Sequence, residues 1–256
     1  MELIRNIVKV GNSAGVILPK EWLNGKARIE LFEKPIDIKK DIFEILEPYL
    51  EDIIGIYLVG SYARGDETPR SDIDVLAITN KTSKRIEKGK YSVTITTKEN
   101  VEETLENNAL IILPMLKEAK SLLNAVLIEK YKETELTKKN LKGYLELTQS
   151  ALKINKEFIE LGTEKVGDAI AYSLILNLRN TYIIKCIREN KLWSNKQLQN
   201  LIKKIAGSLE AYEGYLRVKE NKHSQDRLLA LEARKLYEYI SKKVGEHEQW
   251  LKARKE

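Results

Sequence analysis

The first 34 residues alternate hydrophobic and polar positions in short runs that predict three β-strands. The predicted elements are a strand at residues 4–10, a turn at 11–13, a strand at 16–18 that ends before Pro19, and a strand at 27–31. A β module of this size buries too little apolar surface to be stable alone. We therefore expect it to pair with a second copy or to pack on the rest of the chain.

The pattern changes after Pro35, where apolar residues recur at helical spacing over residues 38–50. Further strands are predicted at residues 53–59, 72–78 and 91–97. The first of these is a continuous apolar run, which is typical of a strand buried on both faces. This order of a helix followed by buried strands indicates a mixed domain in which helices pack on a β-sheet.

From about residue 101 onward nearly the whole chain has a helical pattern, including residues 110–127 and several amphipathic segments between 137 and 252. The expected fold class is therefore α+β, with three domains. These are a small β module at residues 1–34, a mixed-sheet domain at 35–135, and an all-α domain at 136–256.

Charge is distributed unevenly, although 44 Lys and Arg residues against 38 Asp and Glu residues give a net charge of only +6. From residue 137 to the end, 24 basic and 15 acidic residues give +9, and the remaining 20 basic and 23 acidic residues give −3. A basic C-terminal half favours a polyanionic partner such as RNA. Solvated, lysine-rich helix faces explain the same charge without any partner.

The sequence lacks the features of secreted and membrane-spanning proteins. Cys186 is the single cysteine, so no internal disulfide can form. The residues after Met1 have no signal-peptide layout, and the longest apolar runs are too short to cross a bilayer. We expect a soluble protein of the cytoplasm.

A Gly-Ser pair follows the predicted strand at 53–59 and precedes a short helical segment. Glycine at position 60 lets the backbone approach a ligand closely. The amides at a helix start, together with the Ser61 hydroxyl, suit phosphate oxygens. This turn is therefore a candidate phosphate site.

Asp72 and Asp74 begin the next predicted strand. Residues i and i+2 of a strand point to the same face, so the two carboxylates project together. Adjacent carboxylates repel each other unless a cation lies between them, and oxygen ligands beside a nucleotide phosphate indicate magnesium. Two such ions would hold the attacking and the leaving oxygen of an in-line displacement.

The stretch Gly-Ser-Tyr-Ala-Arg-Gly at residues 60–65, followed by Ser-Asp-Ile-Asp at 71–74, resembles nucleotidyltransferases of the DNA-polymerase-β type. It is most similar to the minimal nucleotidyltransferases of prokaryotes, specifically over residues 53–78 and more weakly over the rest of 36–135. The resemblance implies transfer of a nucleoside monophosphate, with AMP as the first expectation. The donor would be ATP or another NTP, the acceptor a hydroxyl, and pyrophosphate would leave.

The resemblance also implies a role for each residue of this stretch. Gly60 and Ser61 would hold the triphosphate, with Ser71 as a helper. Asp72 and Asp74 would be the catalytic residues that bind Mg²⁺, as a pair of ions. Arg64 would neutralise phosphate charge in a water-poor site, or alternatively form a salt bridge that orders the loop.

One feature departs from the family pattern, which usually places a third carboxylate on a following strand. The strand predicted at 91–97 carries no acid. Glu87 comes just before it and Glu99 just after it, and both are poor substitutes. The sequence therefore leaves open whether the site is catalytically active.

Residues 7–21, in which Val-Gly-Asn-Ser-Ala-Gly leads towards Pro-Lys-Glu, resemble the AbrB/MazE-type swapped-hairpin DNA-binding domain. The resemblance implies an interlocked homodimer whose basic residues contact DNA phosphates. The candidate contacts are Arg5, Lys9, Lys20, Lys26 and Arg28. Because residues 1–34 carry a net charge of only +2, dimerisation or packing without DNA binding is the alternative.

The basic helical part is expected to act as a lid or an acceptor-binding domain, since nucleotidyltransferases commonly close their cleft with helices. Arg179, in an otherwise apolar helix, is either a cleft residue or a structural arginine. Arg217 and His223 have the spacing of HEPN-type ribonucleases, but their polar surroundings favour a loop between helices. Trp193 is expected to pack at a helix junction.

Two functions are compatible with the sequence. The first is a magnesium-dependent nucleotidyltransferase whose acceptor is a protein side chain, as in toxin–antitoxin pairs, a small molecule such as an aminoglycoside, or an RNA. The second is a DNA-bound dimeric regulator that senses nucleotides with little or no turnover. The Asp72/Asp74 pair favours the first, and the missing third acid with the N-terminal resemblance favours the second.

Overall fold

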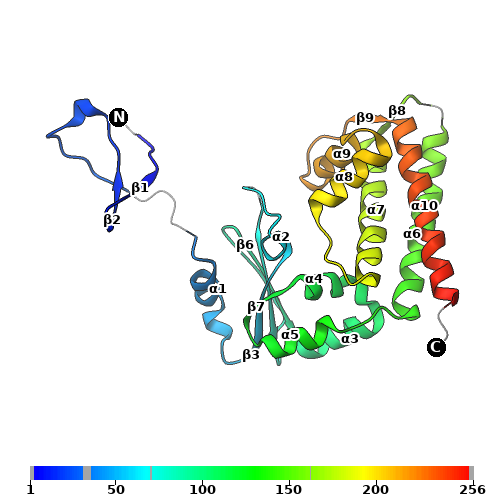
Figure 1. Ribbon diagram of the computed structural model, residues 1–256, viewed down its shortest axis with the longest axis horizontal. Helices are drawn as coiled ribbons and strands as arrows, with labels where there is room; N and C mark the ends of the chain where they lie inside the picture. The colour runs from blue at the N-terminus through cyan, green and yellow to red at the C-terminus, as the bar shows by residue number, and fades with distance from the viewer. Residues whose placement is uncertain (1–2, 31–35, 70, 162, 254–256) are drawn as a thin grey trace. The chain divides into compact units, whose positions relative to one another are not determined.

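The computed structural model describes residues 3–30, 36–69, 71–161 and 163–253 (Figure 1). The chain divides into two units, Met1–Ile38 and Lys39–Glu256. The first is the small β module, and the second contains the mixed sheet and the C-terminal helices. This arrangement confirms the predicted α+β class.

The first unit contains an antiparallel hairpin of β1 (Ile7–Val10) and β2 (Ser13–Val16), followed by the 3-10 turn η1 (Lys20–Trp22). The hairpin turns at Gly11, whose φ of +60° suits a two-residue turn. The second strand was predicted at 16–18, but it pairs directly across this turn and so begins at Ser13. The strand predicted at 27–31 is wrong over residues 27–30, which form no strand, and residue 31 lies outside the described residues.

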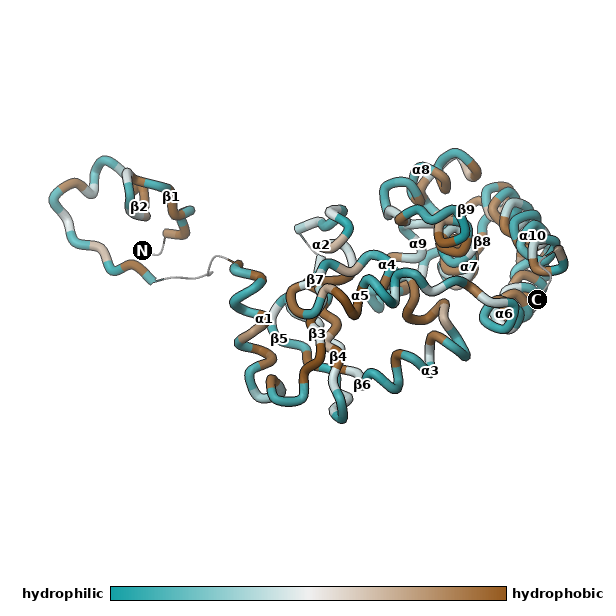
Figure 2. The backbone as a smooth tube through the Cα atoms, turned by 60° about the horizontal axis from the view of Figure 1, so that its bottom comes forward, coloured by the Kyte–Doolittle hydropathy of each residue, from teal (hydrophilic) through white to brown (hydrophobic). Residues whose placement is uncertain are grey.

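The second unit is built on a five-stranded sheet in the order β5-β6-β4-β3-β7. All neighbouring strands are antiparallel except the parallel pair β4 and β6. The strands are β3 (Ile53–Val59), β4 (Ile73–Thr79), β5 (Lys84–Lys88), β6 (Tyr91–Thr97) and β7 (Lys120–Leu123). The three strands predicted in this domain are confirmed as β3, β4 and β6, and β3 is drawn mostly in the brown of hydrophobic residues in Figure 2.

Helices cover both faces of the sheet (Figure 1). Helix α1 (Ile38–Leu46), extended by η2 (Glu47–Tyr49), lies on one face, where Asp41 accepts a hydrogen bond from the Tyr91 hydroxyl of β6. The other face carries α3 (Lys98–Asn108), η3 (Ala109–Ile111), α4 (Leu113–Glu118) and α5 (Ala125–Lys132). The predicted helix at 110–127 is therefore wrong over residues 120–123. Those residues pair with β3 as the edge strand β7, a long-range contact that local periodicity does not encode.

Within the described residues, the C-terminal region is a bundle of five helices with a two-stranded antiparallel sheet of β8 (Lys165–Gly167) and β9 (Asp226–Leu229). The helices are α6 (Lys138–Glu160), α7 (Asp168–Arg188), α8 (Asn195–Ala206), α9 (Glu210–Lys219) and α10 (Ala230–Ala253). Helices α6, α7 and α10 lie side by side (Figure 1) around a core that also includes residues of α8 and α9. Within the described residues, no helix combines the length and the apolar character that crossing a membrane requires.

The bundle packs directly on the sheet domain. Leu141 of α6 and Ile184 of α7 are fully buried in the core that contains Tyr57 and Leu76 of the sheet. This shared core fixes α7 relative to β3 and β4. The beginning of α8 is thereby brought beside the turn that follows β3, where Asp66 contacts Asn195.

Candidate active site

Strand β3 ends at Val59, and the Gly-Ser pair that follows begins the short helix α2 (Gly60–Arg64). Gly60 has a φ of +71°, in the left-handed region that favours glycine. A Cβ atom at this position would overlap the Asp74 carboxylate. Glycine is therefore required both by the backbone angle and by the close approach of Asp74.

Asp74 lies near the start of β4, where it pairs with Val59 in the register of β3 and β4. It is half-buried, and this burial raises the pKa of its carboxyl above the usual range, with the charge of Asp72 acting in the same direction. Lys219, Arg64 and Arg85 partly offset the rise in pKa. Across the described residues, neither Asp72 nor Asp74 forms an ion pair or a side-chain hydrogen bond.

The two carboxylates suit a magnesium ion. Magnesium is commonly bound through one or two carboxylates, with waters and substrate phosphates completing the six oxygen ligands. No group of three or more His, Cys, Asp or Glu side chains among the described residues is arranged to hold a metal ion.

The two serines named by the sequence differ in their surroundings. Ser61 is half-buried, and its hydroxyl has no hydrogen-bond partner within the described part of the chain. Ser71 instead accepts a hydrogen bond from the Thr68 amide at 2.9 Å, and its hydroxyl also lies 3.2 Å from that of Thr68. Ser71 thus orders the turn before Asp72, and its predicted phosphate role stays a prediction.

Arg64, at the end of α2, is held on three sides. Its Nη1 donates to Glu118 at 2.6 Å, and its Nε and Nη2 reach the Asp66 carboxylate at 3.1 to 3.3 Å. The guanidinium lies 3.9 Å from the ring centre of Trp193, and only 7% of the side chain is exposed. These contacts match the predicted loop-ordering salt bridge, while direct phosphate contact by Arg64 stays a prediction.

Glu118 contacts both Gly60 and Arg64, which the sequence did not predict. It ends α4 with only 7% of its surface exposed, and its second oxygen accepts the Gly60 amide at 2.8 Å. Burial raises the pKa of its carboxyl, while Arg64 and the Gly60 amide lower it. Glu118 comes 58 residues after Gly60 and two residues before β7, a strand that the sequence did not predict, so no local pattern connected Glu118 with Gly60.

The strand register places Ser92 where an acid was expected. Ser92 of β6 pairs with Asp74 on one side and with Glu87 of β5 on the other. Paired residues share a face of the sheet, so all three side chains lie in one row. Glu87 accepts a hydrogen bond from the Ser92 hydroxyl at 3.1 Å and from Arg85 at 2.7 Å. The sequence located Glu87 only as a residue before β6, because the charged edge strand β5 was not predicted.

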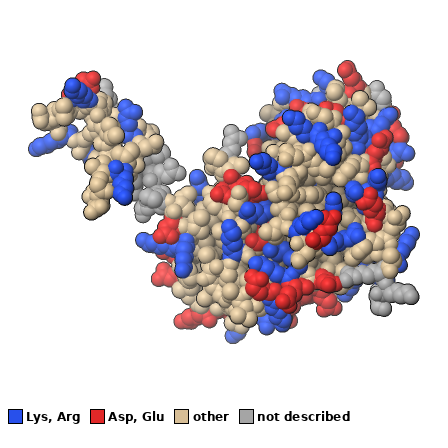
Figure 3. Space-filling model, in the orientation of Figure 1, with Lys and Arg blue, Asp and Glu red and all other residues tan. Residues whose placement is uncertain are grey.

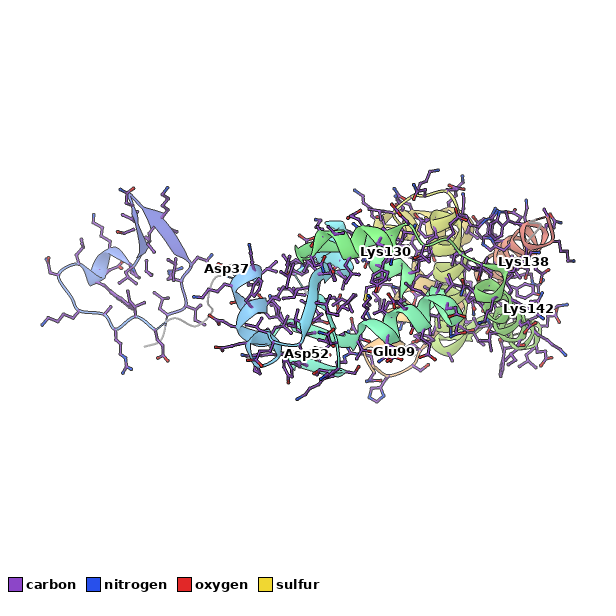
Figure 4. The ribbon with its side chains drawn as sticks, turned by 90° about the horizontal axis from the view of Figure 1, so that it is seen from below. Asp37, Asp52, Glu99, Lys130, Lys138 and Lys142 are labelled. Carbon is purple, nitrogen blue, oxygen red and sulfur yellow. The ribbon has the colours of Figure 1, made fainter. Side chains whose placement is uncertain are left out.

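Glu99 lies at the opposite end of the sheet from Asp74. Thr97, the last residue of β6, is five residues beyond Ser92, which is about 17 Å of extended strand. Thr97 pairs with Thr79 of β4, which pairs with Ile53 at the start of β3, the end of that strand away from Gly60. Glu99 follows Thr97 and is labelled in Figure 4. Glu99 is therefore excluded as part of the site.

Residues 38–193 match the model of the nucleotidyltransferase domain family, and this match covers more than half of the chain. The chain belongs to this family. Similar solved structures include the spectinomycin adenyltransferase AAD(9) from Enterococcus faecialis, determined with ATP and spectinomycin, at 14% identity and a TM-score of 0.42 over 80% of this chain and 97% of that one. Another is a nucleotidyltransferase-like protein from Exiguobacterium sibiricum, at 12% identity and a TM-score of 0.36 over 81% and 73%. No curated protein matches the sequence.

The helical domain of this nucleotidyltransferase approaches the site through several basic residues. Lys219 of α9 is close enough to Asp74 to lower the pKa of its carboxyl. Arg179 of α7 lies 4.9 Å from the ring centre of Trp193, the same ring that Arg64 contacts.

Arg217 is bound to Asp168 and Glu210 at 2.8 Å, and His223 is exposed in the loop between α9 and β9. The ribonuclease pairing of Arg217 and His223 gains no support from these contacts.

The basic residues predicted to contact DNA are all exposed on the N-terminal module. They are Arg5, Lys9, Lys20, Lys26 and Arg28. On the helical part, blue basic side chains are interspersed with red acidic ones on the face shown in Figure 3. This mixture resembles solvated helix faces more than a continuous polyanion-binding surface.

Proposed function

We propose that this nucleotidyltransferase uses magnesium, as a pair of ions at Asp72 and Asp74, to move AMP or another nucleoside monophosphate from an NTP to an acceptor hydroxyl. The observation that carries the proposal is the carboxylate pair beside the Gly60 turn. Neither carboxylate forms a direct ion pair with a cationic side chain within the described residues, although Asp74 is half-buried. A pair of this kind is stabilised by bound divalent cations.

Bound magnesium ions would neutralise charge on the triphosphate and on the attacking and leaving oxygens. Asp72 and Asp74 would hold these ions at the start of β4. The Ser61 hydroxyl donates to a phosphate oxygen, and Gly60 leaves the space that a side chain would fill. The bond from the α-phosphorus to pyrophosphate breaks as the bond to the acceptor oxygen forms.

The acceptor hydroxyl also has to lose its proton, and Glu87 is the acid that shares the Asp74 row. Hydrogen bonds from Arg85 and Ser92 lower the pKa of its carboxyl, so Glu87 is ionised at neutral pH. A carboxylate with a lowered pKa is a weak base. The site is therefore suited to slow transfer, with proton acceptance by Glu87 or by solvent.

The proposal is tested by incubating the purified chain with each α-³²P-labelled NTP, magnesium and a cell lysate that supplies protein, RNA and small-molecule acceptors. Asp72→Asn and Asp74→Asn should each reduce label transfer at least 100-fold, because each removes a metal ligand. Glu99→Gln, at the far end of the sheet, is the matched control and should retain transfer. Absence of transfer by the wild type, or equal transfer by the Asp72 and Asp74 variants, would contradict the proposal.

A second proposal concerns the N-terminal module. We infer that it joins two copies of the chain, with DNA binding through Arg5, Lys9, Lys20 and Arg28 as an accompanying function. Every described residue of 3–30 is exposed or half-buried, and apolar side chains such as Ile4, Ile17 and Leu23 are at least 70% exposed. A module without buried residues needs a partner surface. A salt-dependent gel shift that disappears on substituting these basic residues would support the DNA function.

A further inference from the structure

A buried ionic network runs from the Gly60 amide to the first residue of α8. Glu118 accepts from the Gly60 amide with one oxygen and pairs with Arg64 through the other. Arg64 then pairs with Asp66, whose Oδ2 accepts from the Asn195 amide at 2.9 Å. Each step is a direct contact, so the turn of the nucleotide site and the helical domain are joined without a gap.

The charged members of this network are shielded from solvent. The side chains of Glu118, Arg64 and Asp66 are only 5%, 7% and 14% exposed. Charge-assisted hydrogen bonds between buried groups have strong geometric preferences. A displacement of Asn195 at one end of the network should therefore also displace the Gly60 amide at the other end.

Trp193 gives the same connection an apolar component. It is 7% exposed and lies just before α8, with the Arg64 guanidinium 3.9 Å and the Arg179 guanidinium 4.9 Å from its ring centre. Arg64 belongs to the sheet domain and Arg179 to α7. The indole thus contacts basic groups from both domains at the point where the network crosses between them.

We propose that Glu118, Arg64 and Asp66 are positioning residues through which the helical domain holds the Gly60–Ser61 turn in its nucleotide-binding geometry. The inference rests on the proposed function of that turn. It adds that nucleotide affinity depends on the docking of α8, which is more than 130 residues away in sequence. None of the three residues needs to touch the nucleotide.

Asn195 offers a substitution that breaks the network at a single hydrogen bond. It is the first residue of α8, after the N-cap Ser194, and proline is well tolerated at this helix position. Ser194 already has the extended φ of −143° and ψ of 138° that a following proline prefers. Asn195→Pro therefore removes the amide that Asp66 binds, whereas Asn195→Ala changes the side chain and keeps the amide.

The test is the dissociation constant for MgATP and the other Mg-NTPs, measured by calorimetry on the full chain. Asn195→Pro should weaken nucleotide binding about tenfold, and Asn195→Ala should bind as the wild type does. Glu118→Gln, which keeps a hydrogen-bond acceptor but loses the charge that Arg64 binds, should also weaken binding. Thermal unfolding of each variant establishes that the fold is retained.

A spectroscopic measurement separates positioning from general damage. With Trp22 and Trp250 replaced by phenylalanine, Trp193 is the remaining tryptophan. Its emission should change when nucleotide binds, and Asn195→Pro in this background should abolish the change. Equal affinity for Asn195→Pro and Asn195→Ala, or an unresponsive Trp193, would overturn the inference. Failure of the wild type to bind any NTP would instead overturn the proposed function, and the inference with it.

Discussion

At the scale of single residues, Gly60 is the position where the site tolerates change least. An alanine there has to adopt a φ of +71° and places its Cβ against the Asp74 carboxylate. Gly60→Ala should therefore abolish Mg-NTP binding and lower the melting temperature. Calorimetric titration with Mg-NTP and thermal unfolding measure the two effects.

Gly65 is the matched control for this prediction. It has a similar φ of +75°, but a Cβ there meets open space. Gly65→Ala should cost only ~1–2 kcal/mol of stability from the backbone angle, with nucleotide binding retained. Equal effects of the two substitutions on binding would show that the approach of Asp74 to Gly60 is irrelevant to the site.

Glu87 and Ser92 give a second prediction at this scale. Glu87→Gln should slow label transfer about tenfold or more, because it removes the acid of the Asp74 row while keeping a similar shape. Adding Ser92→Glu should restore transfer, since residue 92 pairs directly with Asp74. Steady-state transfer rates over a range of pH measure both effects.

Transfer by Glu87→Gln, with and without Ser92→Glu, distinguishes a proton acceptor from a structural residue. Loss of transfer that is not restored by Ser92→Glu, or unchanged transfer in Glu87→Gln, would contradict a role of Glu87 in accepting the proton. Retention of Mg-NTP binding in Glu87→Gln is expected, because Asp72 and Asp74 are unchanged.

At the scale of elements, the sequence predicted those whose signal is local. The continuous apolar run of β3 and the runs of β4 and β6 identified the core of the sheet. The edge strands β5 and β7 were missed, since β5 has the charged sequence Lys-Arg-Ile-Glu-Lys and β7 lies within an apolar segment. Both become strands through pairing with distant partners.

The packing of α10 on α7 contains a buried histidine that makes stability depend on pH. His247 is 2% exposed, its Nδ1 accepts from Arg188 at 2.8 Å, and its Nε2 donates to the Thr181 carbonyl at 3.2 Å. Burial is the main cause that lowers the pKa of His247, and Arg188 acts in the same direction. Lys185 of α7, Glu189 directly after α7, and Lys243 and Glu246 of α10 line the adjoining cavity of about 230 Å³.

His247 should therefore reduce stability in acid. The unfolded chain binds a proton at His247 below about pH 6.5, while the folded chain resists protonation. Folding stability should consequently fall as the pH drops below that value. Denaturant unfolding at pH 7.5 and pH 5.5 should show a smaller loss for His247→Gln than for the wild type. The same loss in both proteins would mean that His247 does not titrate on unfolding.

At the scale of the whole molecule, the N-terminal module should determine the oligomeric state. Ile7 and Val10 of β1 and Ile17 beyond β2 are 47%, 59% and 71% exposed. If they are covered by a second copy, the full chain is a dimer in light scattering. Ile7→Asp with Ile17→Asp should give monomers, while Leu147→Asp, an equally exposed site on α6, should not. A monomeric wild type would contradict dimerisation through this module.

In the candidate site, as in the sheet, the sequence predicted residues that are close together in the chain and missed contacts between residues that are far apart. Gly60, Ser61, Asp72 and Asp74 lie within one short segment, so their types and spacing were sufficient to predict them as site residues. Glu118 reaches Gly60 across 58 residues, and Asn195 reaches Asp66 across 129. Those contacts depend on how helices dock on the sheet, which spacing along the chain does not specify.

The central claim is tested most directly by comparing ATP labelled at the α-phosphate with ATP labelled at the γ-phosphate. Nucleotidyl transfer at Asp72 and Asp74 predicts that only the α-label becomes bound to the acceptor, while the γ-label is released in pyrophosphate. Both results should require magnesium and disappear in Asp74→Asn. Transfer of the γ-label to the acceptor, or α-label transfer that persists in Asp74→Asn, would contradict the account.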